Sequence, residues 1–195
     1  MQLDAAKLAW VVVRRVFLSA LLLMNGAAFA ADANFRVNAA SDGNAVRIDA
    51  YALVRAPLAI VWQTLTDYDH LQRFIPGMTT SRVIGRKGVA AIVEQTGEAR
   101  FLMISIPLNV TVSSEEYPPG AIRIHALKGN LRQLEGGYEI AAGGEGLVEL
   151  RWRGKIEPDS PIPPVFTRPI MRAIVEAQFR GMVVEIQRRT AAAHL

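Results

Sequence analysis

The sequence predicts an α+β fold in which a curved antiparallel sheet of about six or seven strands wraps around one long C-terminal helix. Three observations carry this prediction. Segments of alternating apolar residues follow one another through the middle of the chain, tight turns separate them, and a helix with a broad apolar stripe comes last. Because so broad a stripe has to be covered, we expect the helix to pack on the concave face of the sheet.

The first strand and two short helices are predicted in the N-terminal part of this fold. Apolar and polar residues alternate with a period of two over residues 46–54, which is typical of a half-buried strand. Pro57 suits the first turn of a helix. Thr66 or Asp67 can cap a second short helix, which has to end before Pro76.

Further strands are predicted after the second short helix. Gly- and Pro-rich turns separate most of them, and Pro118-Pro119-Gly120 is the clearest of these turns. Pro107 interrupts one strand, which indicates a bulge or an edge position. The expected strands span residues 80–84, 89–99, 102–113, 121–127, 131–141 and 147–156.

The last predicted element is a helix from Val165 to about Arg189, after a proline-rich segment. At about 1.5 Å per residue it would extend roughly 35 Å, which matches the width of a sheet. Two apolar rows run along it at helical spacing. The first row contains Ile170, Ile174, Ala177, Gly181 and Val184, and the second contains Met171, Val175, Phe179, Met182 and Ile186.

Composition limits the classes of function. Of the 195 residues, 51% are hydrophobic and the mean hydropathy is +0.19, both high for a soluble protein. The chain has no cysteine, which excludes disulfide bonds, thiol catalysis and cysteine metal sites. The net charge of +4 falls to +2 without the first 30 residues, and no basic patch is interleaved with aromatic residues. Nucleic acid is therefore not an expected partner.

Residues 1–30 have the three-part pattern of a secretory signal peptide. Positively charged residues precede a short apolar run at 16–24, and a small-residue A-x-A site ends at Ala30. The run is too short to span a bilayer of ~30 Å. The alternative is an uncleaved anchor over residues 8–28, which Arg14-Arg15 would interrupt. We expect cleavage near Ala30 and a periplasmic or secreted protein.

The export route stays open, because Arg14-Arg15 followed by Phe17-Leu18 also resembles a twin-arginine signal. Behind the leader, residues 31–44 are polar and small and are predicted to form a flexible lead. Residues 45–190 are predicted to form one ligand-binding domain, and residues 191–195 a tail.

The segment ALVRAPLAIVWQTLTDYDHLQRFIPGM, with the order of elements around it, resembles the START-like (SRPBCC) superfamily with the helix-grip fold. The closest resemblance is to its coenzyme Q-binding and polyketide cyclase/dehydrase branch. The spacing that carries it consists of Ala56, Pro57, Val61 and Trp62, then Asp67-Tyr68, then Phe74-Ile75-Pro76.

This resemblance covers residues 45–189 and implies a deep apolar cavity between the sheet and the C-terminal helix. Such a cavity holds lipids, isoprenoid quinones or polyketides. The fold does not identify the ligand, because it hosts many functions. The secretion leader is a departure, since familiar quinone-binding and cyclase relatives act inside cells or organelles.

Catalytic candidates are few. His70 lies beside Asp67 and Asp69 and could do acid–base work, although such helical neighbours usually lie on a solvated surface. His125 is expected on the solvent side of its strand. The histidines share no metal-ligand spacing, and the chain has neither a glycine-rich phosphate loop nor a nucleophile motif. We therefore expect no metal and no cofactor.

Candidate ligand-binding residues follow from strand parity, size and position. Arg132 and Tyr138 share parity with apolar neighbours and could meet a polar group in the cavity, or else be a strand-end arginine in water and a core-edge tyrosine. Trp62 and Trp152 either line a pocket or fill the core. A larger residue at Gly181 should fill the cavity. The candidate set is Trp62, Phe74, Met103, Arg132, Tyr138, Trp152, Ile174 and Gly181.

The leading hypothesis is an exported, monomeric, non-enzymatic protein that holds a hydrophobic small molecule of the lipid or isoprenoid quinone class. One alternative is a cyclase or dehydratase that acts on an aromatic or polyketide substrate. It would need ionisable groups that converge inside the cavity, such as His125 or Glu94. A second alternative is an accessory protein that docks a membrane or a protein partner through exposed apolar residues at 74–76 and 162–166.

Overall fold

The described part of the chain is a long antiparallel sheet and one long helix. The computed structural model describes residues 34–101, 104–159 and 164–193. The sheet has eight strands in the order β1-β2-β8-β7-β6-β5-β4-β3. The strands are β1 Phe35–Asp42, β2 Ala45–Arg55, β3 Met78–Lys87, β4 Ala90–Phe101, β5 Ile104–Tyr117, β6 Ala121–Gly129, β7 Leu131–Gly144 and β8 Leu147–Pro158. The helices are α2 Leu58–Leu65, the 3₁₀ helix η1 Tyr68–Arg73 and α3 Pro164–Ala192.

The predicted helix-grip architecture is confirmed, with one strand more than expected. Residues 35–42, predicted to belong to a flexible lead, form β1 and pair antiparallel with β2. A turn at Gly43, where φ is +64°, joins the two strands. Val37 is buried, and the Phe35 ring lies 5.6 Å from the ring of Phe179 on α3. Contacts with the distant helix therefore fix a segment whose own composition is loop-like.

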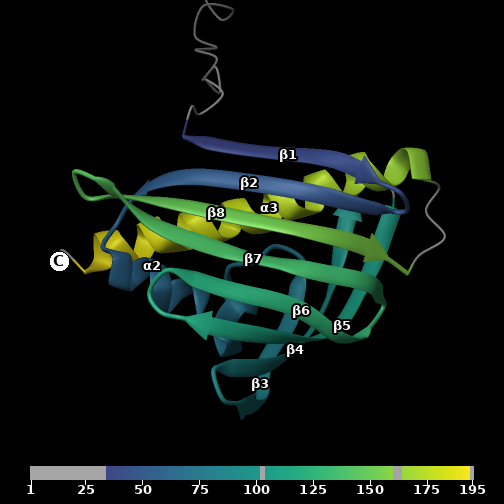
Figure 1. The fold of residues 1–195 in the computed structure, drawn as a ribbon, viewed down its shortest axis with the longest axis horizontal. Helices are drawn as coiled ribbons and strands as arrows, with labels where there is room; N and C mark the ends of the chain where they lie inside the picture. The colour runs from purple at the N-terminus through teal and green to yellow at the C-terminus, as the bar shows by residue number, and fades with distance from the viewer. Residues whose placement is uncertain (1–33, 102–103, 160–163, 194–195) are drawn as a thin grey trace, which may run out of the picture. The chain divides into compact units, whose positions relative to one another are not determined.

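Helix α3 lies along one side of the curved sheet. It packs most closely against β1, β2 and β4, and against α2. In the view of Figure 1 the helix runs behind β2 and β8. The second predicted apolar row is buried along its whole length, from Met171 to Ile186. The first row is buried at Ile170, but Val184 near its other end is 57% exposed. Within the described ranges, no helix combines the length and the hydrophobicity needed to cross a membrane.

The two short helices lie near the C-terminal end of α3. Helix α2 packs against α3, and Asp67 just before η1 pairs with Arg189. Pro57 precedes α2, as predicted, and the second short helix is a 3₁₀ helix rather than an α-helix. Tyr68 and Leu71 of η1 are buried. The carboxylate of Asp69 accepts a hydrogen bond of 2.7 Å from the Val83 amide, which ties η1 to β3.

Gly181 is the point where α3 crosses the loop after η1. A Cβ atom at this position would lie 2.5 Å from the Phe74 carbonyl oxygen and 2.7 Å from Pro76 Cδ. Both distances are shorter than van der Waals contact. Gly181 thus allows helix and loop to approach, and a larger residue there would meet the loop rather than fill the cavity.

Gly181→Ala tests this close approach. An ordinary Gly→Ala change inside a helix stabilises the helix by about 1 kcal/mol. Here we expect the opposite, a loss of about 1–3 kcal/mol in the free energy of unfolding, because the added methyl group overpacks the contact with Phe74. Urea denaturation measures the change, and Ala177→Gly at an exposed position of α3 reports the ordinary helix effect. A stabilised Gly181→Ala protein would contradict the contact.

Candidate ligand cavity

A cavity of about 660 Å³ lies between the middle strands of the sheet, η1 and α3. The helix is close to β1, β2 and β4, whereas the inner faces of β5 to β8 curve away from it and form the opposite wall. From α3, Ile174, Phe179 and Met182 line the cavity. The volume lies within the range of roughly 300–1,000 Å³ that is typical of small-molecule sites.

Two glycines allow close contacts within the curved wall of the sheet. Gly154 of β8 pairs with Gly136 of β7, and Gly136 is in turn opposite Ile124 of β6. A Cβ atom on Gly154 would lie 2.5 Å from the outer ring of Trp152, so the indole lies over the glycine instead of crossing the interior. A Cβ atom on Gly136 would lie 2.5 Å from the Arg153 carbonyl oxygen, so this glycine allows β7 and β8 to approach closely.

The mouth of the cavity lies at the N-terminal end of α3. Ser105, Pro107, Asp159 and Phe166 line the cavity and are also exposed to solvent. Asn130, in the turn between β6 and β7, closes part of this end through hydrogen bonds with the Pro107 carbonyl and the Asn109 amide. A ligand therefore has access from the end of the sheet where β5 begins.

The interior of the cavity is electrically neutral. Among its described lining residues, Asp159 is the one side chain that is charged at neutral pH, and it lies at the mouth, 2.9 Å from Arg132. The remaining polar side-chain groups are the hydroxyls of Tyr68, Tyr138 and serines, the amides of Gln95, Asn130 and Gln178, and the indole N–H of Trp152. Burial is the main cause that raises the pKa of both tyrosine phenols, which keeps them protonated.

Three of the predicted site residues lie in the cavity wall, namely Tyr138, Trp152 and Ile174. Trp62 packs against the core from a half-buried position and does not line the cavity. Met103 lies outside the described residues. The structure thus brings together the candidates from β7, β8 and α3.

Arg132 does not point into the cavity, because a β-bulge reverses its orientation. The pairing of β7 with β8 shifts register between Leu131 and Gln133, and both Leu131 and Leu134 line the cavity. Parity is lost across such a bulge. The Arg132 side chain is 62% exposed and pairs with Asp159 on the outside of the mouth.

Tyr68 was missed as a site residue although it belongs to the motif that carries the family resemblance. It lines the cavity from η1 and is 5% exposed. A 3₁₀ helix of six residues has no extended apolar periodicity that would indicate which side faces inward. The adjacent Asp67-Tyr68 pair was the available signal.

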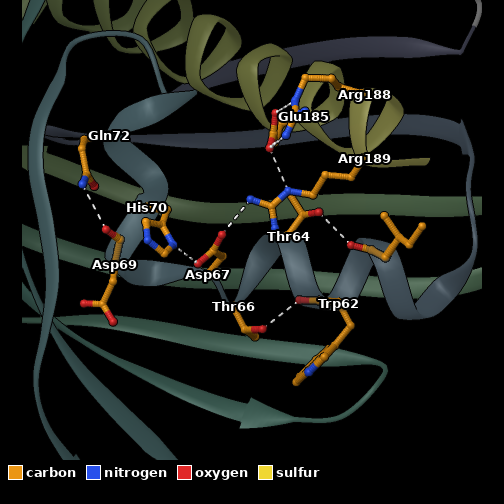
Figure 2. A network of polar contacts seen from close by, with 11 residues as sticks. Trp62, Thr64, Thr66, Asp67, Asp69, His70, Gln72, Glu185, Arg188 and Arg189 are labelled. Atoms are coloured by element: carbon orange, nitrogen blue, oxygen red, sulfur yellow. Dashed lines mark hydrogen bonds and ion pairs between the residues drawn. The ribbon is translucent and has the colours of Figure 1, made fainter. Parts of the chain in front are cut away.

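A separate polar cluster joins η1 to the end of α3 (Figure 2). Phe74, a predicted cavity residue, lies beside this cluster and does not line the cavity. Asp67 accepts a 2.7 Å hydrogen bond from Arg189 and is 2.7 Å from Nδ1 of His70. Glu185 binds the guanidinium groups of both Arg188 and Arg189, with nitrogen–oxygen distances of 2.7 Å. The Arg189 guanidinium also lies 5.5 Å from the centre of the Phe74 ring.

This cluster is a structural tie rather than a part of the cavity. None of its side chains appears among the described cavity-lining residues. Glu185 is buried, and hydrogen bonds from Arg188 and Arg189 lower its pKa from 4.5 to about 2. The predicted Asp67–His70 pair exists, but its carboxylate is engaged by Arg189. In the described part of the chain, no three histidine, aspartate or glutamate side chains gather as metal ligands.

A curved antiparallel sheet that grips a long C-terminal helix around an apolar cavity defines a START-like ligand-binding domain. Residues 45–190 match the sequence profile of the family described as "Polyketide cyclase / dehydrase and lipid transport". The chain belongs to this family. Among curated proteins, a sequence search finds no match.

Solved structures show the same fold at low sequence identity. The Zhui aromatase/cyclase from Streptomyces sp. R1128 is 16% identical with a TM-score of 0.65, over 76% of this chain and 98% of that chain. The STAR-related lipid transfer protein from Xanthomonas axonopodis is 12% identical with a TM-score of 0.64, over 80% and 94%. Human STARD10 is 9% identical with a TM-score of 0.59, over 78% and 73%.

Glu185→Gln tests the tie between η1 and α3. Because the folded-state pKa of Glu185 is depressed to about 2, its ionised form stabilises the fold fully above pH 4.5, and this contribution is lost as the pH falls toward 2. At pH 7 we expect the substitution to lower the free energy of unfolding by about 1–3 kcal/mol.

Urea denaturation at pH 7 and at pH 3 measures this effect, and the difference between the two proteins should shrink at the lower pH. Glu176→Gln is the matched control, since Glu176 forms ion pairs with Arg172 and Arg180 on the same helix from a more exposed position. That control should lose less than about 0.5 kcal/mol. Equal losses of unfolding free energy in both variants would show that the buried network stabilises the fold no more than an exposed ion pair does.

Proposed function

We propose that this domain binds and carries a neutral hydrophobic small molecule of the lipid or isoprenoid quinone class, without converting it. The single observation that carries the proposal is the cavity of about 660 Å³ with apolar walls, open at one end and free of charged groups inside among its described residues. An ionised ligand group would lose its hydration there without gaining a counter-ion.

Burial of apolar surface supplies enough free energy for such binding. Removing about 400 Å² of ligand surface from water gives roughly 10 kcal/mol at about 25 cal/mol per Å². Association and ordering take back several kcal/mol of this. Micromolar affinity therefore needs no more than a fit between the ligand and the walls.

The rival function is catalysis, because the structural neighbours include an aromatase/cyclase as well as lipid transfer proteins. Acid–base catalysis needs a group whose pKa lies near the working pH. The described ionisable side chains of the cavity wall are Asp159 at the mouth and the phenols of Tyr68 and Tyr138, whose pKa values burial raises. His125 and Glu94, which a catalytic site could have used, do not line it. The composition of the cavity wall therefore favours ligand binding over catalysis.

Native mass spectrometry of gently purified protein, followed by lipid extraction, tests the proposal. We expect a bound neutral lipid in the wild-type protein. Ile174→Trp should lower ligand affinity by roughly 10-fold, or about 1.4 kcal/mol, because the larger side chain occupies cavity space. Val184→Trp on the exposed face of the same helix is the matched control and should keep the ligand. Purified protein that carries no ligand and does not bind added hydrophobic probes would refute the proposal.

We further propose that the domain acts outside the cytoplasm, on the strength of the charged, apolar and A-x-A segments in residues 1–30. Expression of the full chain in a Gram-negative host should yield periplasmic protein whose N-terminus is Ala31, as determined by N-terminal sequencing. Ala28→Trp together with Ala30→Trp should block cleavage, because the site requires small residues. Full-length wild-type protein in the cytoplasm would contradict export.

A further inference from the structure

Two phenol hydroxyls in the cavity wall have no hydrogen-bond partner among the described residues. The Tyr68 hydroxyl is buried and has no hydrogen-bond partner of good geometry, although Ser114 and Glu116 lie near it. Tyr138 is half-buried, its hydroxyl has no hydrogen bond to a described residue, and burial raises the pKa of its phenol. A buried hydroxyl without a partner destabilises the fold by about 1–3 kcal/mol. Native proteins keep few such groups, and each calls for an explanation.

The registers of the sheet place the two phenols at the same depth. Tyr138 is opposite Ile122, and Ile122 is opposite Glu116. The hydroxyl of Tyr68 is near Ser114 and Glu116, since both affect the pKa of this phenol. Two steps between neighbouring strands correspond to about 10 Å. Tyr68 from η1 and Tyr138 from β7 therefore approach the interior from two walls at one level of the sheet.

That level is far from the mouth. Ser114 and the mouth residue Ser105 both lie on β5, about 30 Å apart along the strand at its usual rise per residue. A ligand that enters at the mouth would reach the two phenols with the end that enters first. The rest of its length would contact apolar side chains of β5 to β8 and α3.

We propose that Tyr68 and Tyr138 form a polar recognition point that donates hydrogen bonds to a neutral oxygen, such as a carbonyl or hydroxyl oxygen, at the inner end of an otherwise hydrophobic ligand. This inference rests on the proposed binding function and specifies its ligand class. Protonated phenols are donors, and the neutral interior disfavours a carboxylate or phosphate as their acceptor. An apolar skeleton with a ketone, quinone or alcohol oxygen at one end meets both conditions.

The experiment compares menadione, a naphthoquinone, with 2-methylnaphthalene, its hydrocarbon counterpart without the oxygens. The chain has no cysteine, so the quinone meets no thiol. Isothermal titration calorimetry measures both affinities in the wild-type protein, Tyr68→Phe, Tyr138→Phe and the double variant. Tyr117→Phe is the control, because this tyrosine is exposed and its hydroxyl binds Glu115.

We expect the wild-type protein to prefer menadione, and each cavity substitution to weaken menadione binding by about 2- to 10-fold without changing the affinity for 2-methylnaphthalene. The melting temperature of the empty protein should stay the same or rise in both variants, because each removes a hydroxyl that has no partner. Tyr117→Phe should change neither affinity.

Equal binding of the two probes to all variants would overturn the recognition point while leaving the cavity binder intact. Failure of the wild-type protein to bind either probe would instead refute the proposed function. A clear drop in the melting temperature of empty Tyr68→Phe would overturn the role of Tyr68, since it would show that its hydroxyl is bonded within the protein, with Ser114 or Glu116.

Discussion

The packing of α3 against one side of the sheet is the constraint on which the rest of the structure depends. One row of the helix, from Met171 to Ile186, is buried along its length, and α3 is closest to β1, β2 and β4. Strands β5 to β8 then have to curve around a helix that they do not closely contact. Gly136 and Gly154 allow close contacts within this curved part of the sheet, and a cavity of about 660 Å³ lies between these strands and α3.

The position of the helix is fixed at both ends by different means. Near its N-terminus, Arg172 donates a hydrogen bond of 3.0 Å to the Val37 carbonyl of β1. Near its C-terminus, Arg189 bonds both Glu185 and Asp67, the residue that immediately precedes η1 (Figure 2). Among the described residues, these ion pairs lie outside the cavity, whose lining is neutral except for Asp159 at the mouth. This separation is the basis on which we propose a neutral hydrophobic ligand.

Sequence periodicity predicted most strands and the long helix, because alternation and helical spacing are local properties. The predictions were wrong at positions where strand pairing or tertiary contacts override the local pattern. The segment at 35–42 has few strong strand formers, yet it pairs with β2 and packs on α3. Arg132 has the parity of a cavity residue, but a bulge turns it outward. Phe74 was expected in the cavity and lies beside Arg189, since its part of the loop after η1 packs against α3 at Gly181.

The sequence by itself determined the α+β class, the order of the elements, the family resemblance and the apolar character of the interior, because these follow from residue type and spacing. Only the tertiary structure decided that the interior is hollow, where its mouth lies, and that Tyr68 and Tyr138 face it at one depth. Those properties depend on how far a curved sheet stands from a helix, and that distance arises from contacts between residues far apart in the chain.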